Sequence, residues 1–268
     1  MNLYLRELKN LYKPFLAWSA GVAVLIFTGM TKYSAFQTAE NGAALESILN
    51  RFPKIMMSIM GVSQEGMQTV GGFYAVLEYY VTICTIIYAI HLGANAVSRE
   101  SIDKTYEFIF TRPCTRSYIL SRKILAALTC MILFNLIHLL ISYVALSALN
   151  IENTIPKAMN LFGIGVFLNG LLFFSLSAFF SAFAKRPEKG TRNSYLCFMV
   201  AFVFAILFDT YRDIHIFQIL SPIKYFMAEE LLKGKFDLVF LGVCLILSGL
   251  LIGGTFVLFE KKDLQAVS

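Results

Sequence analysis

Six long apolar segments limit what this chain can fold into. They occupy residues 14–31, 73–97, 124–149, 159–184, 194–208 and 236–259. A helix needs about 20 apolar residues to cross roughly 30 Å of hydrocarbon, although the short fifth segment needs neighbouring residues or local thinning. Only 15% of the 268 residues are charged and 57% are hydrophobic, which leaves too little charge to cover a soluble domain. We therefore expect an all-α integral membrane protein with six transmembrane helices, in which residues 1–268 form a single transmembrane domain.

The distribution of basic residues indicates which side each connection faces. If both termini lie on the inner side, 15 of the 23 Lys and Arg residues fall in inner segments and 8 in outer segments. The positive-inside rule then predicts that both termini are cytoplasmic. This topology, together with attraction to anionic membrane lipid, accounts for the net charge of +6. The basic excess therefore requires no nucleic-acid partner.

Two further regions are predicted to contain helices outside the spans. Leu5, Leu8 and Tyr12 recur at helical spacing beside basic residues. This pattern predicts an amphipathic N-terminal interfacial helix before Pro14 turns the chain into the bilayer. In the last outer connection, the Ser-Pro pair at 221–222 can end one helix and begin another. Short outer helices are therefore expected between the fifth and sixth spans.

Motifs for catalysis and nucleotide binding are absent from the sequence. The nearest approach to a phosphate-binding loop, PEKGTRNS at 187–194, has its Gly and Lys in the wrong order, and we expect it to be a loop. No H-E-x-x-H or G-x-S-x-G pattern occurs. The five cysteines form no C-x-x-C pair, and no His/Cys spacing suits a metal. The sequence thus predicts no catalytic, cofactor-binding or metal site in this chain, and no enzyme activity.

Polar side chains inside two spans are candidates for a substrate path. On the second span they are Glu78, Thr82 and Thr85, and on the third they are Asn135, His138 and Ser142. Each set shares one helical face, so the two sets could line a path between subunits. They could equally form interhelical hydrogen bonds, and Glu78 could lie at the outer interface. The sequence leaves these interpretations open.

Small residues form strips on two other spans. Gly163, Gly170 and Ser177 recur at every seventh position of the fourth span, and the sixth span carries Gly242, Gly249 and Gly253. Such strips let helices approach closely, so they predict packing surfaces rather than ligand sites.

Residues 99–123, RESIDKTYEFIFTRPCTRSYILSRK, form an amphipathic segment between the second and third spans. Its apolar side chains at helical spacing are Ile102, Tyr106, Ile109 and Phe110. Its acidic side chains, which suit an anionic inner leaflet poorly, are Glu100, Asp103 and Glu107. Pro113 would end this helix, and Thr115 would cap the next one. A helix lying on lipid is one explanation, but we favour docking into a soluble protein.

This segment resembles the inner loop of permease subunits of the ABC type 2 transporter family, which typically reads E-x-x-x-G-T-x-E-x-x-x-x-x-P-x-[ST]-R. The matching residues are Glu100, Thr105, Glu107, Pro113, Thr115 and Arg116, while Lys104 replaces the usual Gly. Two other stretches are similar to family motifs, L-S-P-x-K-Y at 220–225 and F-E-K-K-D-L at 259–264. The resemblance spans the whole chain and includes the six-span layout.

The resemblance implies that this segment is a coupling helix that binds a separate ATPase subunit. The implied ATPase-coupling interface comprises Glu100, Ile102, Asp103, Thr105, Tyr106, Glu107, Ile109, Phe110, Pro113, Thr115 and Arg116. It also implies two copies of an ABC ATPase subunit that bind ATP and Mg, and a second permease subunit, identical or related. The implied function is that of a bacterial cell-membrane permease that exports a drug, peptide, lipid or similar substrate. The alternative is a membrane scaffold or sensor that binds a soluble partner through the same loop without transporting a solute.

Overall fold

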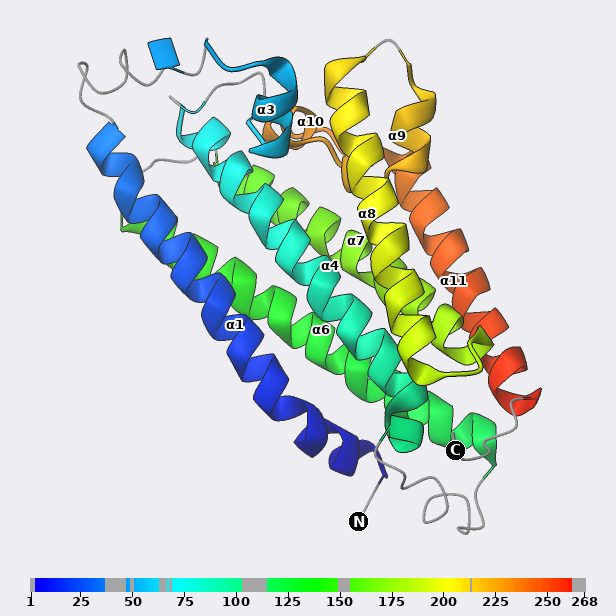
Figure 1. The fold of residues 1–268 in the computed structure, drawn as a ribbon. Coiled ribbons are helices and arrows are strands. Elements are labelled where there is room, and N and C mark those ends of the chain that lie inside the picture. The colour runs from blue at the N-terminus through cyan, green and yellow to red at the C-terminus, as the bar shows by residue number, and fades with distance from the viewer. Residues whose placement is uncertain are drawn as a thin grey trace.

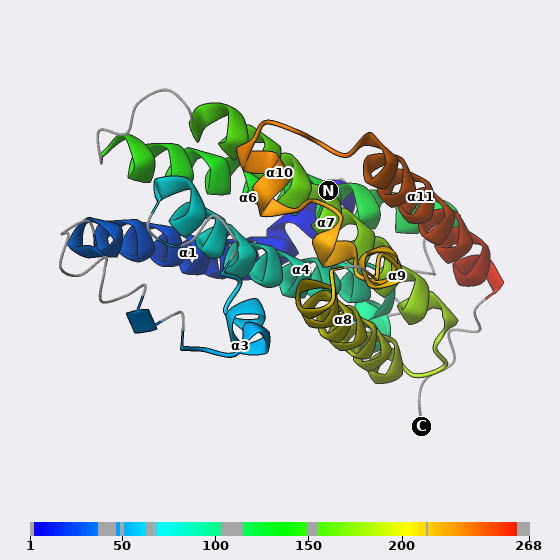
Figure 2. The ribbon, with the colours of Figure 1, turned by 90° about the horizontal axis from the view of Figure 1, so that it is seen from above.

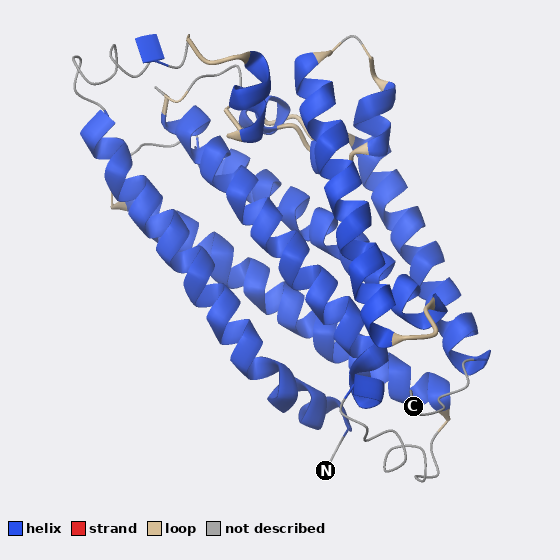
Figure 3. Ribbon diagram, viewed as in Figure 1, coloured by secondary structure: helices blue, strands red, loops and turns tan. Residues whose placement is uncertain are grey.

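Six long helices lie side by side in the part of the chain that the structure describes. This computed structural model describes residues 3–36, 47–48, 51–62, 67, 69–102, 115–148, 155–212 and 214–261. The long helices are α1 (Leu3–Phe36), α4 (Val70–Ile102), α6 (Arg116–Ser147), α7 (Ile155–Phe183), α8 (Pro187–Thr210) and α11 (Leu238–Lys261) (Figure 1). Each is long and apolar enough to cross a membrane. No strand occurs among the described residues (Figure 3), so the all-α, six-span prediction is confirmed.

Short helices gather at one end of the bundle (Figures 1 and 2). They are α3 (Lys54–Ile59), α9 (Ile216–Leu220), the 3₁₀ helix η1 (Pro222–Lys224) and α10 (Ala228–Leu232). The last three occupy the connection in which short helices are predicted. There Pro222 begins η1, where its missing N–H costs nothing and its fixed φ suits the first helical position.

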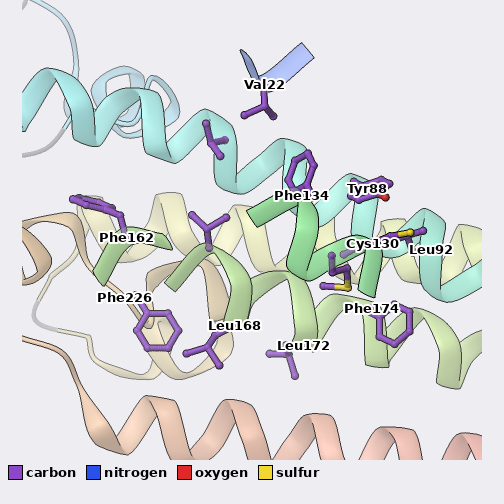
Figure 4. Packing of buried hydrophobic residues seen from close by; sticks show 14 of the residues in the cluster. Val22, Tyr88, Leu92, Cys130, Phe134, Phe162, Leu168, Leu172, Phe174 and Phe226 are labelled. Carbon is purple, nitrogen blue, oxygen red and sulfur yellow. The ribbon is translucent and has the colours of Figure 1, made fainter. Parts of the chain in front are cut away.

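Helices α4 and α7 form the centre of the bundle and bury most of their side chains, whereas α1, α8 and α11 bury only a minority of theirs. Helix α1 packs on α6, and α11 packs on α7. Figure 4 shows the apolar core between these helices, where the Tyr88 and Phe134 rings lie 5.1 Å apart between centroids. In a membrane protein the outward-facing apolar side chains suit lipid, so exposure of α11 needs no soluble partner.

Small residues allow α4 and α7 to approach closely. A Cβ atom on Gly93 of α4 would lie 2.4 Å from the Phe174 carbonyl oxygen of α7, and the Ser177 hydroxyl donates a 2.8 Å hydrogen bond to the Ile90 carbonyl. Gly170, from the predicted strip on α7, likewise packs against α4. The packing role predicted for this strip is confirmed.

The strip predicted on α11 has a different environment. A Cβ atom on Gly242, Gly249 or Gly253 would meet no atom within 4 Å in the described structure. The buried face of α11 instead consists of Cys244, Ser248, Thr255 and Phe259. The predicted packing surface is therefore wrong within this chain, because Gly242, Gly249 and Gly253 are not on the buried face of α11.

Helix α1 corrects the expectation for the N-terminus. Leu3–Phe36 is one continuous helix with Pro14 inside it, so a separate interfacial helix ending at Pro14 is not confirmed. Proline removes one backbone hydrogen bond and usually kinks a helix rather than ending it when both flanks favour helix. The ribbon of α1 bends toward its N-terminal end (Figure 1).

Helix α8 corrects the expectation for residues 187–194. These residues are not a loop but the first two turns of α8, in which Pro187 takes the first helical position. Gly190 is buried there, and a Cβ atom on it would lie 2.6 Å from Cα of Ser181 in α7. The fifth membrane helix therefore has 24 residues, so residues next to the apolar segment extend it, as the short length of that segment requires.

The first and the last of the described helices place the start of α1 and the end of α11 at the same end of the bundle (Figure 1). The start of α1, the end of α4, the start of α6 and the end of α11 lie there, whereas α3, α9 and α10 lie at the opposite end (Figure 1). An even number of crossings produces this arrangement. The inner and outer connections of the predicted topology thus fall at opposite ends.

Candidate functional site

A buried polar pair joins α4 to α6. Glu78 lies about two turns after the start of α4, and His138 lies in the middle part of α6. The His138 Nε2 atom is 2.8 Å from the Glu78 Oε1 atom, and both side chains are almost fully buried. A buried charged or polar group is costly unless a partner compensates it, so each side chain supports the other in the apolar bundle. The structure thus brings together two of the predicted substrate-path residues.

Further polar atoms surround this pair. Tyr74 lies one turn before Glu78 on α4, and its buried hydroxyl has no hydrogen-bond partner among the described residues. Glu78 Oε2, His138 Nδ1 and Ser142 Oγ also have no hydrogen-bond partner among the described residues. Buried polar groups are normally hydrogen-bonded, so this cluster has unused capacity to bind water or a ligand.

The other three predicted path residues have different environments. Thr82 and Thr85 each donate a 2.8 Å hydrogen bond to the carbonyl oxygen four residues earlier in α4. Asn135 is half-buried, and its Oδ1 atom has no hydrogen-bond partner in the described part of the chain. The six predicted residues therefore do not form one connected polar stripe.

Glu78 also lines a cavity of about 420 Å³ at the end of the bundle that carries α3 and α10. The cavity wall comes from α3, α4, α7, the end of α8 and the segment from η1 to α10. Its buried polar lining residues within the spans are Glu78, Thr82 and Asn169. Its apolar lining includes Ala75, Phe162, Val166, Ile223 and Phe226. Such a size, with a mostly apolar wall and few polar groups, is typical of small-molecule sites.

Two ion pairs line the same cavity. Asp209, at the end of α8, accepts hydrogen bonds from the Ser58 hydroxyl of α3 at 2.7 Å and from the Lys224 ammonium of η1 at 2.5 Å. Arg212 donates two hydrogen bonds to Glu229 of α10, at 2.7 and 3.1 Å. The hydrogen bond with Glu229 is the main cause that raises the pKa of Arg212 above its ordinary value. The pairs tie α3, η1 and α10 to the end of α8.

The aromatic ring of Tyr79 forms another part of the wall. The Lys224 ammonium lies 5.7 Å from its centroid, within the range of a cation–π interaction. Gly61 approaches the same ring with a φ of 71°, and a Cβ atom there would lie 2.3 Å from the ring edge. A larger residue at position 61 would therefore displace Tyr79 as well as strain the backbone.

Three of these lining residues, Asn169, Asp209 and Lys224, were not among the predicted site residues. Asn169 is a polar residue within the predicted fourth span, so the criterion that selected Glu78 also applies to it, whereas Asp209 lies one position after the predicted fifth span. Lys224 lies in the L-S-P-x-K-Y motif, in which the sequence gives no indication that the lysine meets Asp209. That contact depends on the fold of the segment after α8.

Only the ends of the predicted coupling interface belong to the described residues. Outside them lie Asp103, Thr105, Tyr106, Glu107, Ile109, Phe110 and Pro113, whereas Glu100 and Ile102 belong to the last turn of α4. Thr115 is the N-cap of α6, and its hydroxyl accepts a 3.3 Å hydrogen bond from the Tyr118 N–H. The predicted cap is confirmed.

A contact between helix ends lies directly after this cap. The Arg116 guanidinium donates a 3.3 Å hydrogen bond to the Glu260 carbonyl oxygen, and the Ser117 hydroxyl bonds to the Glu260 carboxylate. The start of α6 is therefore attached to the end of α11. Residues 103–114 connect to this junction through the first residues of α6.

Among the described residues, no group of three or more His, Cys, Asp or Glu side chains is arranged to hold a metal ion. The described cysteines, Cys84, Cys130, Cys197 and Cys244, form no disulfide with one another. The polar cluster around Glu78 and the cavity that Glu78 lines are the candidate ligand sites in the described part of the chain.

A family model described as ABC-2 family transporter protein matches residues 1–264. The chain belongs to the ABC-2 transporter family. The match covers nearly the whole sequence, so the family resemblance drawn from the motifs is confirmed. No curated protein matches the chain.

Membership of the ABC-2 family shows what kind of protein the six helices form. The chain is a multi-pass membrane protein and a membrane component of an ABC transporter, not itself the ATPase. ABC-2 family permeases work in general with ABC ATPase partners. The cavity and the junction of α6 with α11 are therefore features of a transport component.

Proposed function

We propose that this ABC-2 family protein is the permease subunit of an ATP-driven exporter in a bacterial cell membrane, with both termini in the cytoplasm. It couples ATP hydrolysis by two copies of a separate ATPase subunit, which bind ATP and Mg, to efflux of a drug, peptide, lipid or similar substrate. A second permease subunit completes the transporter. The observation that carries the proposal is the attachment of Arg116 and Ser117 to Glu260.

This attachment supports coupling because it links residues 103–114 to two membrane helices. A displacement of that segment would reach α6 directly and α11 through Glu260. Closure of the ATPases on ATP would displace the segment and favour one arrangement of the membrane helices over the other. ATP changes this population only because it binds the two states with different affinity.

The proposed substrate path includes Glu78, Thr82, Thr85, Asn135, His138 and Ser142. Support is strongest for Glu78 and Thr82, because both line the cavity of about 420 Å³. His138 and Ser142 belong to the buried cluster around Glu78, and they would adjust its hydrogen bonding as a substrate passes. Thr85 and Asn135 would extend the polar face farther along α4 and α6.

Coupling can be tested by co-purifying the permease with a candidate ABC ATPase and measuring ATP hydrolysis. The test variant is Tyr106→Ala with Ile109→Ala, which removes the apolar face of the coupling segment. The matched control is Tyr211→Ala with Ile214→Ala, the same pair of residue types at the same spacing on exposed positions at the opposite end of the bundle. We expect ATPase binding to weaken about 10-fold or more in the test variant and to stay unchanged in the control.

Equal binding and turnover in both double variants would refute the coupling assignment. Transport in reconstituted vesicles separates the remaining alternatives. ATP-dependent movement of a candidate drug or peptide supports the exporter. Binding of the ATPase without movement of any solute would instead indicate the scaffold or sensor.

A further inference from the structure

Two buried oxygen acceptors belong to residues that line one cavity. Glu78 of α4 is 1% exposed and Asn169 of α7 is 3% exposed. Glu78 Oε1 is bonded to His138, but Glu78 Oε2 and Asn169 Oδ1 have no hydrogen-bond partner among the described residues. Leaving such an acceptor unpaired in an apolar region is unfavourable, more so for a charged group. A ligand that donates hydrogen bonds would provide a partner for both acceptors.

The charges around the cavity favour a cationic donor. Asp209 is paired with Lys224, and Arg212 with Glu229, so these four residues neutralise one another. Lys54 also lines the cavity, but it lies on exposed α3 at the outer end, where solvent screens its charge. The remaining buried carboxylate is that of Glu78, whose Oε1 atom is paired with His138, so its Oε2 atom is the group left to attract a cationic donor. An anionic ligand would meet this carboxylate without a free buried cation to balance it.

The rest of the wall suits an apolar body. Phe162 and Val166 of α7, with Ile223 and Phe226 from the connection after α8, supply aliphatic and aromatic surface. Tyr79 adds an aromatic ring to the wall, with the Lys224 ammonium 5.7 Å from its centroid. A volume of about 420 Å³ accommodates a small organic molecule rather than a folded domain or a long peptide.

We propose that this cavity binds a small amphipathic molecule through its protonated primary amine. The ammonium donates hydrogen bonds to Glu78 and Asn169, and the apolar body lies against α7 and the segment from η1 to α10. That the amine is also the transported substrate rests on the proposed function. Binding of the amine does not depend on the proposed function, because the cavity lies within a single chain.

Binding is measured on the purified permease alone, without the ATPase, in nanodiscs of phosphatidylcholine, a lipid without a primary amine. The probe is dansylcadaverine, a fluorescent primary amine with an aromatic body, and the neutral probe is its N-acetyl derivative. The variants are Glu78→Gln, which removes the charge, and Asn169→Leu, which removes the amide at similar volume. The control is Glu7→Gln, because Glu7 is also a buried glutamate but lies on α1, away from the cavity.

We expect the wild type and Glu7→Gln to bind the amine with equal affinity. Glu78→Gln should weaken amine binding about 10- to 100-fold, the usual range for a hydrogen bond to a charged group, and Asn169→Leu should weaken it less. Both should leave the weaker binding of the N-acetyl probe unchanged. Equal affinity for the two probes, or amine binding that is unaffected in both cavity variants, would overturn the proposal.

The source of the amine is tested by adding phosphatidylethanolamine to the nanodiscs. Competition that depends on Glu78 identifies the lipid headgroup as an occupant, and its absence identifies a free amine. The proposed function can fail independently of this site. Amine binding without coupling to the ATPase would refute the proposed exporter function but not the proposed amine site. Coupled transport without amine binding would refute the proposed amine site but not the exporter function.

Discussion

At the scale of single residues, two glycines distinguish a packed helix face from an unpacked one. A Cβ atom on Gly93 would lie 2.4 Å from a backbone oxygen of α7, whereas one on Gly249 of α11 would meet nothing within 4 Å. We expect Gly93→Ala to force α4 and α7 apart and to destabilise the protein by about 1–3 kcal/mol. Gly249→Ala should leave the melting temperature unchanged or slightly raise it, because alanine favours helix. Thermal unfolding in detergent compares the two, and equal melting temperatures would contradict the close packing of α4 on α7.

The pair of Glu78 and His138 provides a second prediction at this scale. His138→Leu leaves the Glu78 carboxylate buried without the partner that now lies 2.8 Å away. Removing one member of a buried pair typically costs about 3–5 kcal/mol, whereas replacing both by apolar residues is far better tolerated. The double variant Glu78→Leu with His138→Leu should therefore melt at a higher temperature than His138→Leu alone. A double variant less stable than the single one would show that the pair contributes through packing rather than through its polar contact.

At the scale of helices, apolar periodicity predicts where spans lie but not where each helix begins. The prediction placed helix boundaries at Pro14 and after residues 187–194, yet α1 runs through Pro14 and α8 begins at Pro187. Proline occurs both inside kinked helices and at their first position, so its presence alone does not fix a boundary. Gly190 likewise suggests a loop in the sequence, although the close approach of Ser181 explains it within a helix.

The attachment of α3 to α8 depends on one carboxylate. Asp209 accepts hydrogen bonds from Ser58 of α3 and from Lys224 of η1. Asp209→Asn removes the charge that holds both, so amide hydrogen exchange in Lys54–Ile59 should become about 10-fold faster, equivalent to about 1.4 kcal/mol. The control is Asp237→Asn, because the Asp237 carboxylate accepts hydrogen bonds from the nearby Val239 and Phe240 amides at the start of α11 and asparagine is also a good cap. Exchange in α3 that is equal in both variants would show that Asp209 does not hold α3.

At the scale of the whole molecule, the cavity could not be derived from sequence patterns. Its lining joins α3, α4, α7 and the connection after α8, and Ser58 meets Asp209 across 151 positions of the chain. The sequence shows that Glu78 is a polar residue within an apolar run. It also shows His138 on another helix, but it does not show that the two side chains pair. Helix spacing places residues on a face, whereas the pairing of faces depends on how all six helices pack.

The two ends of the bundle differ in charge, which leads to a prediction for the protein in its membrane. Lys185, Arg186, Lys189 and Arg192 lie at or just before the start of α8, at the same end as the end of α4 and the start of α6 (Figure 1). By the positive-inside rule this end faces the cytoplasm. In a variant lacking the five native cysteines, exposed Lys189→Cys and Lys233→Cys sites report on opposite ends. A maleimide that does not cross membranes should label Lys233→Cys on intact cells, and should label Lys189→Cys only after the membrane is permeabilised. The reverse pattern would place residues 103–114 outside the cell, where no ATP-hydrolysing partner could drive them.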